Sequence, residues 1–444
     1  MKKWIFFVVQ EDMKVKKRYD FIAVGFTIFA IFFGAGNLIF PPEIGMNSGR
    51  EWFISLLGFF ISGIGLPLLG ILALNKAGSL EKFGEKIGNK FTNIYTALIL
   101  ICLGPIVAIP RTGASTYEMS ILPNLGNIIS PTIFSIIFFG ITLILTLKPT
   151  KIVEYIGKVL TPIILVILSF IIVKGIFFTE HIFSQGTGNS FSYGFINGYQ
   201  PMDALGAPLT AVIAINAIVA LGYTKNSERK SVLKKASIVS SIGLIIIYGG
   251  LLYLGAALGG YFPQGISQTE LTIGIAHMIL GDLGKIALGV AVAVACLTTA
   301  IGLTAMVGEF FSKTLKIKYE IIVIIICISS AIISILGISS IVKLAIPILK
   351  IFYPMQIILI LFNVIGVKNK LTYKVTVYTT LIVSILDVLY TQFNLRVLQG
   401  IFNFLPLSSE GFAWIIPAII AILISLLINI FNKEKVNVNL LDVE

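Results

Sequence analysis

The segment Gly34-Ala35-Gly36-Asn37 has the residue types of a binding site made from backbone atoms. It interrupts an apolar helix predicted over 21–46, and glycine weakens an α-helix. A break at membrane depth is tolerated only where the freed backbone groups line a polar cavity. The N–H groups of Ala35, Gly36 and Asn37 then carry the positive end of a helix dipole, which suits a carboxylate. The alternative, a small-residue packing motif, requires a different glycine spacing.

The two halves of this helix offer opposite partial charges at the break. The first half ends with carbonyl groups, from Ala30 to Phe33, that have no partner within the helix and suit a cation. The second half is expected to run over Leu38, Ile39 and Phe40 and to end at Pro41-Pro42. A carboxylate and a cation are therefore both predicted at one interruption.

A second interruption lies within the predicted helix 194–222, where glycines and prolines surround a carboxylate. Asp203 falls near the membrane midplane, where a charged side chain is costly and usually functional. With Gln200 and Met202 beside it, Asp203 is a candidate for substrate binding. Its alternative role is to cap the resumed half of the helix, and the two roles are compatible.

Two adjacent threonines, Thr298 and Thr299, lie in the predicted helix 284–312. Their hydroxyl oxygens suit a hard cation such as sodium. The alternative is that each hydroxyl binds a carbonyl of its own helix, which is common in membranes.

Three further charged residues lie within predicted spans. Arg111 is about 28 Å along its helix from Thr92, near the outer interface, and Glu118 follows two turns later on the same face. They are candidates for a paired outer gate, although an arginine that extends to the interface is the alternative for Arg111. Lys350 lies deep in the span 340–365, with Asp203 and Asp387 as candidate partners. It is either a proton carrier, a fixed charge that replaces an ion, or half of a structural pair.

The composition places these residues in a membrane protein. Hydrophobic residues make up 57% of the 444, charged residues only 12%, and the mean hydropathy is +0.97. A soluble chain carries about twice that charge. The apolar blocks predict an all-α polytopic protein with twelve transmembrane helices, because each is long enough to cross a bilayer. The predicted spans are 21–46, 52–74, 92–117, 131–147, 155–178, 194–222, 231–258, 284–312, 319–336, 340–365, 373–391 and 412–431.

The net charge of +12 is distributed as in a membrane protein and does not indicate a nucleic-acid partner. Of the 33 Lys and Arg residues, 26 fall in the N-terminal tail, the C-terminal tail and alternate loops. This alternation is the positive-inside pattern, and it predicts a plasma-membrane protein with both termini in the cytoplasm.

The two interrupted helices are the first and the sixth, and they run in opposite directions. This is the signature of a 5+5 inverted repeat with two C-terminal helices added. The predicted organisation is a tail over 1–18, repeats over 19–178 and 194–365, two helices over 373–431 and a tail over 432–444.

Enzymatic chemistry is not predicted. The three cysteines lack the spacing of a disulfide framework or a zinc site, and no GxxxxGK[ST] sequence occurs. The spans contain no nucleophile–base pair, so neither catalysis nor a cofactor other than a coupling ion is expected. No nucleic-acid or obligate protein partner is indicated.

Four motifs, in this order and spacing, resemble the bacterial branched-chain amino acid:cation symporter family: FFGAGNLIFPP, GPIVAIPRTGASTYE, GYQPMDALGA and LTTAIGLT. The resemblance implies a LeuT-type fold and uptake of leucine, isoleucine and valine by symport with sodium or protons, through alternating access. It places the substrate carboxylate at Ala35, Gly36 and Asn37.

By analogy of fold, the carbonyls of Ala30 and Phe33 with the hydroxyls of Thr298 and Thr299 form a sodium site. The chain departs from the family pattern at Pro201, where threonine is usual, and at Lys350, where an apolar residue is usual. Two adjacent hydroxyls outweigh one lysine, so sodium is preferred to protons. The rival functions are symport of another neutral amino acid and a twelve-helix channel or flippase, for which the spans hold few charges.

Overall fold

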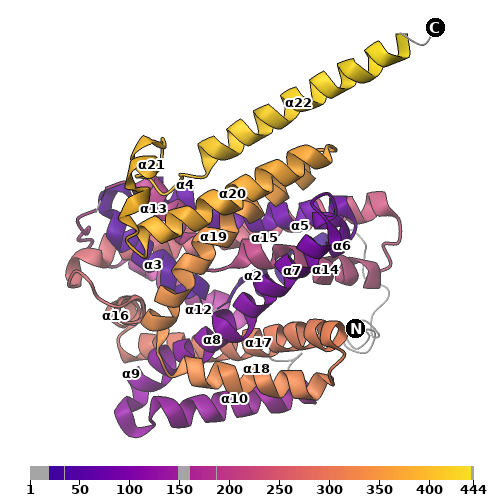
Figure 1. Ribbon diagram of the computed structural model, residues 1–444. Coiled ribbons are helices and arrows are strands. Elements are labelled where there is room, and N and C mark those ends of the chain that lie inside the picture. Colours follow the sequence, from indigo (N-terminus) through magenta and orange to yellow (C-terminus); the bar gives the residue numbers. More distant parts are fainter. Residues whose placement is uncertain (1–19, 35, 149–160, 187, 442–444) are drawn as a thin grey trace. The chain divides into compact units, whose positions relative to one another are not determined.

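The computed structural model describes residues 20–34, 36–148, 161–186 and 188–441. Every regular element in these residues is a helix (Figure 1), which confirms the all-α prediction. Ala35, the tail 1–18 and the start of the predicted span 155–178 lie outside the described residues. Seven described helical segments are long and apolar enough to cross a membrane, and shorter apolar helices accompany them. The count of twelve crossings stays a prediction.

The helices follow the predicted spans closely, with some spans divided in two. In chain order they are α2 (Asp20–Phe32), α3 (Gly36–Ser48), α4 (Trp52–Phe59), α5 (Leu66–Ala77), α6 (Leu80–Gly84), α7 (Asn89–Ile101), α8 (Ala108–Thr116), α9 (Leu122–Leu125), α10 (Pro131–Leu147), α12 (Thr161–Phe177), α13 (Ser190–Asn197), α14 (Asp203–Ala220), α15 (Asn226–Leu258), α16 (Gln268–Leu280), α17 (Asp282–Leu315), α18 (Tyr319–Ser334), α19 (Ile338–Ile365), α20 (Lys370–Thr391), α21 (Gln399–Phe404) and α22 (Ile415–Leu441).

Both predicted interruptions are present. The first separates α2 from α3, and the second separates α13 from α14, where Met202 adopts a left-handed conformation with φ of 66°. The first differs from the prediction in its length, because α3 continues through Pro41 and Pro42 to Ser48. Prolines within a membrane helix are tolerated where surrounding groups satisfy the freed carbonyls.

The chain groups into two compact units. Unit 1 comprises Met1–Leu72 with Thr96–Ile346, and unit 2 comprises Ala73–Tyr95 with Pro347–Glu444. These boundaries do not coincide with the predicted repeats, so the repeat organisation stays a prediction. All the predicted site residues except Lys350 belong to unit 1.

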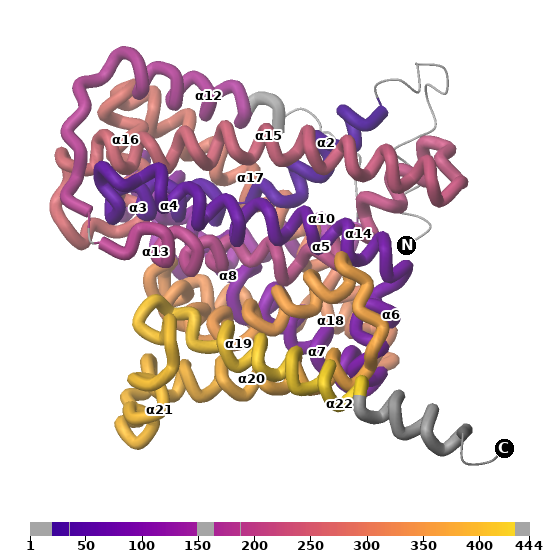
Figure 2. The backbone as a smooth tube through the Cα atoms, turned by 90° about the horizontal axis from the view of Figure 1, so that it is seen from above, coloured from indigo at the N-terminus to yellow at the C-terminus, as the bar shows by residue number. Residues whose placement is uncertain are grey.

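In unit 1, the long helix α15 runs alongside α2 and α3 (Figure 2). Glycines allow α3 and α15 to approach closely. A Cβ atom on Gly45 would lie 1.8 Å from the Leu252 carbonyl oxygen, and one on Gly255 would lie 1.9 Å from that of Pro42. Small residues permit such backbone contact in membrane proteins. A second layer of unit 1 holds α10, α17 and α18 side by side (Figure 1).

In unit 2, α20 packs along α22. The short helix α6 is joined to α19 by the amide of Asn363, which donates a 3.0 Å hydrogen bond to the Phe83 carbonyl. Unit 2 therefore has polar connections of its own.

Candidate functional site

Asn37 connects the two helix interruptions of unit 1. Its side chain is only 2% exposed. The amide nitrogen lies 2.6 Å from the Phe32 carbonyl oxygen at the end of α2 and 2.8 Å from Oδ2 of Asp203 at the start of α14. It also donates to the hydroxyl of Tyr248 on α15. Buried polar groups require such partners, so Asn37 fixes the position of its own helix α3 relative to α2, α14 and α15.

Asp203 points toward Asn37 rather than serving as a cap. The N-cap residue of α14 is Met202, and Asp203 is the first helical residue. The capping alternative for Asp203 is therefore wrong, because the left-handed turn at Met202 already closes the helix start. The dipole at the N-terminus of α14 favours a carboxylate at this position.

The backbone at the first interruption is less open than expected. The N–H group of Asn37 donates a 3.1 Å hydrogen bond to the Gly34 carbonyl, so it is not free for a ligand. The prediction of a free N–H at Asn37 is wrong, because the Gly34 carbonyl accepts its hydrogen bond. Gly36 remains at the N-terminus of α3.

Arg111 lies beside both interruptions. Its side chain is 5% exposed, and Nη1 donates a 2.7 Å hydrogen bond to the Gln200 carbonyl. The guanidinium lies 5.4 Å from the centroid of the Phe40 ring on α3. The helix that carries Arg111 is not straight, so the rise of one continuous helix does not give the depth of Arg111, and its place near the outer interface stays a prediction. A π-helical segment, Cys102–Ile106, kinks this helix, and Gly104 there has φ of −89° and ψ of −118°.

Gly36 provides the space that Arg111 occupies. A Cβ atom on Gly36 would lie 2.6 Å from Nη2 and 2.9 Å from Cζ of Arg111. The α3 N-terminus and a guanidinium thus present positive charge at one point, which suits an anionic group.

Glu118 has contacts of a different kind. It accepts a 3.0 Å hydrogen bond from the Thr269 hydroxyl on α16 and a 2.8 Å hydrogen bond from the Ile338 N–H at the start of α19. Through these contacts Glu118 connects its own helix to the first turns of α16 and α19. A gating role for Arg111 and Glu118 stays a prediction.

Because Arg111 and Glu118 have different partners, we expect their effects on uptake to be independent. In a double-mutant cycle with Arg111→Gln and Glu118→Gln, the two effects on kcat/KM should add within about 0.5 kcal/mol. A coupling of about 2 kcal/mol or more would show instead that the two side chains act as a pair.

The predicted cation ligands are placed around the end of α2. Oγ1 of Thr299 lies 3.6 Å from the position of a Cβ atom on Gly34. The Thr298 hydroxyl lies 3.0 Å from the carbonyls of both Val294 and Ala295 in its own helix, as the alternative predicted. A hydroxyl that donates its hydrogen this way still has oxygen lone pairs for a cation.

Ala30 is exposed on α2, and Phe33 is buried with its ring stacked on those of Phe29 and Tyr248. The roles of the Ala30 and Phe33 carbonyls as ligands stay predictions.

The second interruption contributes an unused polar atom. Oε1 of Gln200 is buried and has no hydrogen-bond partner within the part of the chain that the structure describes. Met202 beside it is 1% exposed. Buried polar atoms are rarely left unpaired, so Gln200 is suited to bind a ligand or an ordered water.

Tyr248 is a site residue that the sequence reasoning missed. It is fully buried, contacts Asn37 and lies 3.5 Å from the Phe32 carbonyl oxygen through its hydroxyl. Its ring also packs edge-on against Phe59 at 5.8 Å. The available signal was that Tyr248 is one of only two tyrosines, with Tyr253, in the apolar span 231–258.

Lys350 is half-buried on α19 in unit 2. Asp387 on α20 of the same unit is close enough for the two charges to attract. Oδ1 of Asp387 has no hydrogen-bond partner among the residues described. Of the two candidate partners, Asp387 is the one placed in the same unit as Lys350.

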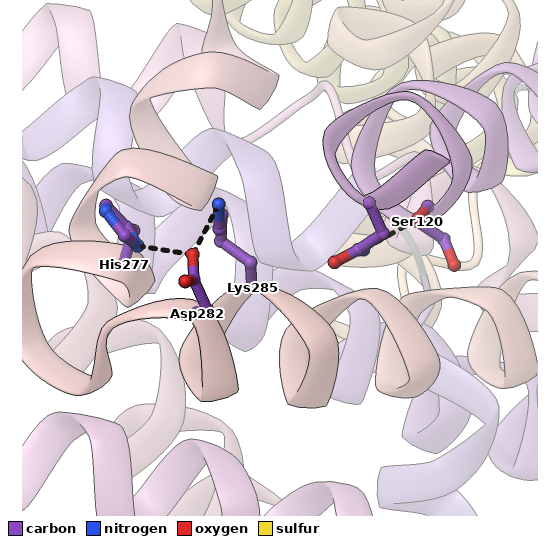
Figure 3. A network of polar contacts seen from close by, with 5 residues as sticks. Ser120, His277, Asp282 and Lys285 are labelled. Carbon is purple, nitrogen blue, oxygen red and sulfur yellow. Dashed lines mark hydrogen bonds and ion pairs between the residues drawn. The ribbon is translucent and has the colours of Figure 1, made fainter. Parts of the chain in front are cut away.

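Figure 3 shows a separate polar network at the turn between α16 and α17. Oδ1 of Asp282 lies 2.7 Å from Nζ of Lys285 and 3.7 Å from Nδ1 of His277. Asp282 is exposed, and exposed ion pairs contribute about 0–1 kcal/mol. Like Asp203, Asp282 is the first residue of a helix, but it lies at the surface.

Comparison with known proteins identifies the family. A family model described as "Branched-chain amino acid transport protein" matches residues 17–432. The branched-chain amino acid permease BraB of Bacillus subtilis (strain 168) is 36% identical over 434 residues, which cover 95% of this chain and 98% of that protein. Such relatives are permeases and carriers, which confirms that the chain is not an enzyme.

Solved structures with a similar fold are also transporters. Mhp1 in its inward-facing conformation has a TM-score of 0.58 at 12% identity and covers 94% of each chain. A Na⁺-coupled sialic acid symporter has a TM-score of 0.60 at 14% identity, covering 92% of this chain and 90% of that one. At these identities the likeness shows the fold alone, a LeuT-like helical transporter fold. The chain is a multi-pass membrane protein, and it belongs to the branched-chain amino acid transport protein family.

Proposed function

We propose that this protein imports leucine, isoleucine and valine across the plasma membrane by sodium symport, with both termini in the cytoplasm. The single observation that carries the proposal is the contact between Asn37 and Asp203, which brings both helix interruptions to one buried place. Alternating access then requires only that the helices around this place rearrange.

The charges around the interruptions fit a zwitterion. The N-terminus of α3 at Gly36 and the guanidinium of Arg111 provide positive charge for the substrate carboxylate. Asp203 provides negative charge for the substrate ammonium group. The buried Oε1 of Gln200 is a further acceptor. In this proposal the charged ends of a bound amino acid pair with Arg111 and Asp203, whose charges are costly to bury without a partner.

The rings near Asn37 fit an apolar substrate side chain. The Phe33 ring stacks on the Tyr248 ring, and the Phe59 ring packs edge-on against it. All three side chains are buried. Ligand sites for apolar groups are lined mostly by such side chains, with a few polar groups that fix orientation.

Sodium is the proposed coupling ion. Thr299 lies against Gly34, and Thr298 donates its hydrogen to its own helix, so both hydroxyl oxygens remain available to a cation. Neutral oxygens replace a hydration shell without a titratable group.

The direct test is uptake of labelled leucine into proteoliposomes under an imposed sodium gradient or an imposed proton gradient. We expect uptake to follow the sodium gradient and to be competed by isoleucine and valine, but not by alanine or phenylalanine. Uptake that follows the proton gradient alone would overturn the sodium proposal. Competition by alanine or phenylalanine at equal concentration would indicate the rival substrate class.

Thr298→Ala with Thr299→Ala is expected to raise the sodium concentration for half-maximal uptake by about tenfold or more, since two ligands are removed. Lys350→Met, a substitution in unit 2, is expected to leave sodium dependence unchanged. The sodium dependence of initial uptake rates measures both. Loss of sodium dependence in the Lys350 variant alone would move the coupling site to unit 2.

A further inference from the structure

Three lysines gather at one end of unit 2. Lys76 ends α5, Lys86 lies between α6 and α7, and Lys368 lies between α19 and α20. Lys86 is close enough to Lys76 and Lys368 for their charges to repel. None of the three makes an ion pair within the part of the chain that the structure describes.

Hydrogen bonds fix two of these ammonium groups in place. Nζ of Lys76 donates a 2.7 Å hydrogen bond to the Val364 carbonyl, and Nζ of Lys86 donates to the Val367 carbonyl. Cations at the C-terminus of a helix, here α19, are favoured by its dipole. Since an ammonium group has three N–H donors, each lysine retains two for another acceptor.

Tyr373 restrains Lys86 further. Nζ of Lys86 lies 4.7 Å from the centroid of the Tyr373 ring, a cation–π contact. Burial lowers the pKa of Lys86, and the charges of Lys76 and Lys368 lower it further, while Glu85 opposes the shift. A bound anion would relieve this repulsion, so the cluster is suited to a ligand with negative charge.

An apolar surface begins next to the lysines. Phe91 at the start of α7 contacts Tyr378 on α20, with ring centroids 5.6 Å apart. Ile94 on α7 is 52% exposed and Ile382 on α20 is 56% exposed. Exposed apolar side chains on membrane helices face the acyl chains of lipids. The lysines and this surface together match the two parts of one phospholipid.

We propose that Lys76, Lys86 and Lys368 bind the headgroup phosphate of an anionic phospholipid, whose acyl chains lie along the Phe91–Tyr378 surface. Basic sites at the membrane surface recognise anionic headgroups in this way. The ammonium groups of Lys76 and Lys86 are already held at the end of α19, so this part of the site needs little reorganisation to bind.

The test is titration of phosphatidylglycerol or phosphatidylcholine into the purified full chain in detergent, with the lipid-bound fraction measured by native mass spectrometry. The wild type is expected to prefer phosphatidylglycerol. Lys76→Gln, Lys86→Gln and Lys368→Gln combined should weaken that binding about 100-fold, since each lysine near an anionic headgroup contributes about fivefold. Glutamine keeps an N–H donor for the α19 carbonyls, and the thermal midpoint of the variant checks its folding.

Two matched variants complete the design. Replacing all three lysines by arginine keeps the charge and should keep the preference. Lys225→Gln, Lys230→Gln and Lys234→Gln combined remove three exposed lysines around the start of α15 and should also leave it unchanged. If the Lys225, Lys230 and Lys234 variant loses as much phosphatidylglycerol binding as the Lys76, Lys86 and Lys368 variant, the binding is nonspecific attraction and the proposed site is overturned. Glycerol phosphate that binds as tightly as phosphatidylglycerol would show a free phosphate ligand and overturn the lipid assignment.

Discussion

Asp203→Asn is expected to lower kcat/KM for leucine uptake by about 100-fold while the protein reaches the membrane in normal amounts. The part-buried carboxylate accepts a hydrogen bond from Asn37 and, in our proposal, binds the substrate ammonium group. Removing one partner of a buried, hydrogen-bonded charge pair costs about 2–5 kcal/mol. Asparagine retains an acceptor for Asn37, so the contact between the interruptions should survive. Initial uptake rates, normalised to protein in the membrane, measure the effect.

Asp282→Asn is the matched control, because Asp282 is also the first residue of a helix. It is exposed and pairs with Lys285 at the surface, so its loss should change uptake by less than about twofold. Similar losses in both variants would mean that Asp203 acts only on the stability of a helix start, contrary to the proposed role.

Gly36→Ala is expected to lower uptake by about tenfold or more. The added Cβ atom would lie 2.6 Å from Nη2 of Arg111, so the guanidinium must shift, and we expect this shift to weaken its contact with the Gln200 carbonyl. A displaced buried charge costs about 3–5 kcal/mol when it loses its partner. The helix itself should not suffer, because alanine is the best helix former.

Gly140→Ala controls for the general effect of a methyl group in a membrane helix. Gly140 lies within α10, where no atom is within 4 Å of the new Cβ position. Uptake by this variant should match the wild type. Normal uptake by Gly36→Ala would contradict the placement of Arg111 at the substrate site.

The sequence predicted both helix interruptions because glycine and proline act on the local backbone. Gly34 and Gly36 lie at the first break, and Met202 lies in the turn of the second. Such local effects require no knowledge of the tertiary fold. The contact between Asn37 and Asp203 could not be predicted this way, because it depends on how two distant segments pack.

The contact of Arg111 with the Gln200 carbonyl could not be predicted for a related reason. A uniform rise of about 1.5 Å per residue assumes one straight helix. The π-helical segment at Cys102–Ile106 kinks the helix, so that assumption does not hold. Gly104-Pro105 was the local signal of this kink. Tyr248 was missed because tyrosines among apolar residues are usual in a buried helix, and its role follows only from its contact with Asn37.

The most direct test of the account is a cryo-EM structure of the full chain with leucine and sodium. We expect density for leucine between Gly36 and Asp203, with its carboxylate toward Arg111 and Gly36 and its ammonium group toward Asp203. Sodium is expected between the end of α2 and Thr298 and Thr299. Leucine bound elsewhere, in particular within unit 2 near Lys350, would contradict the account.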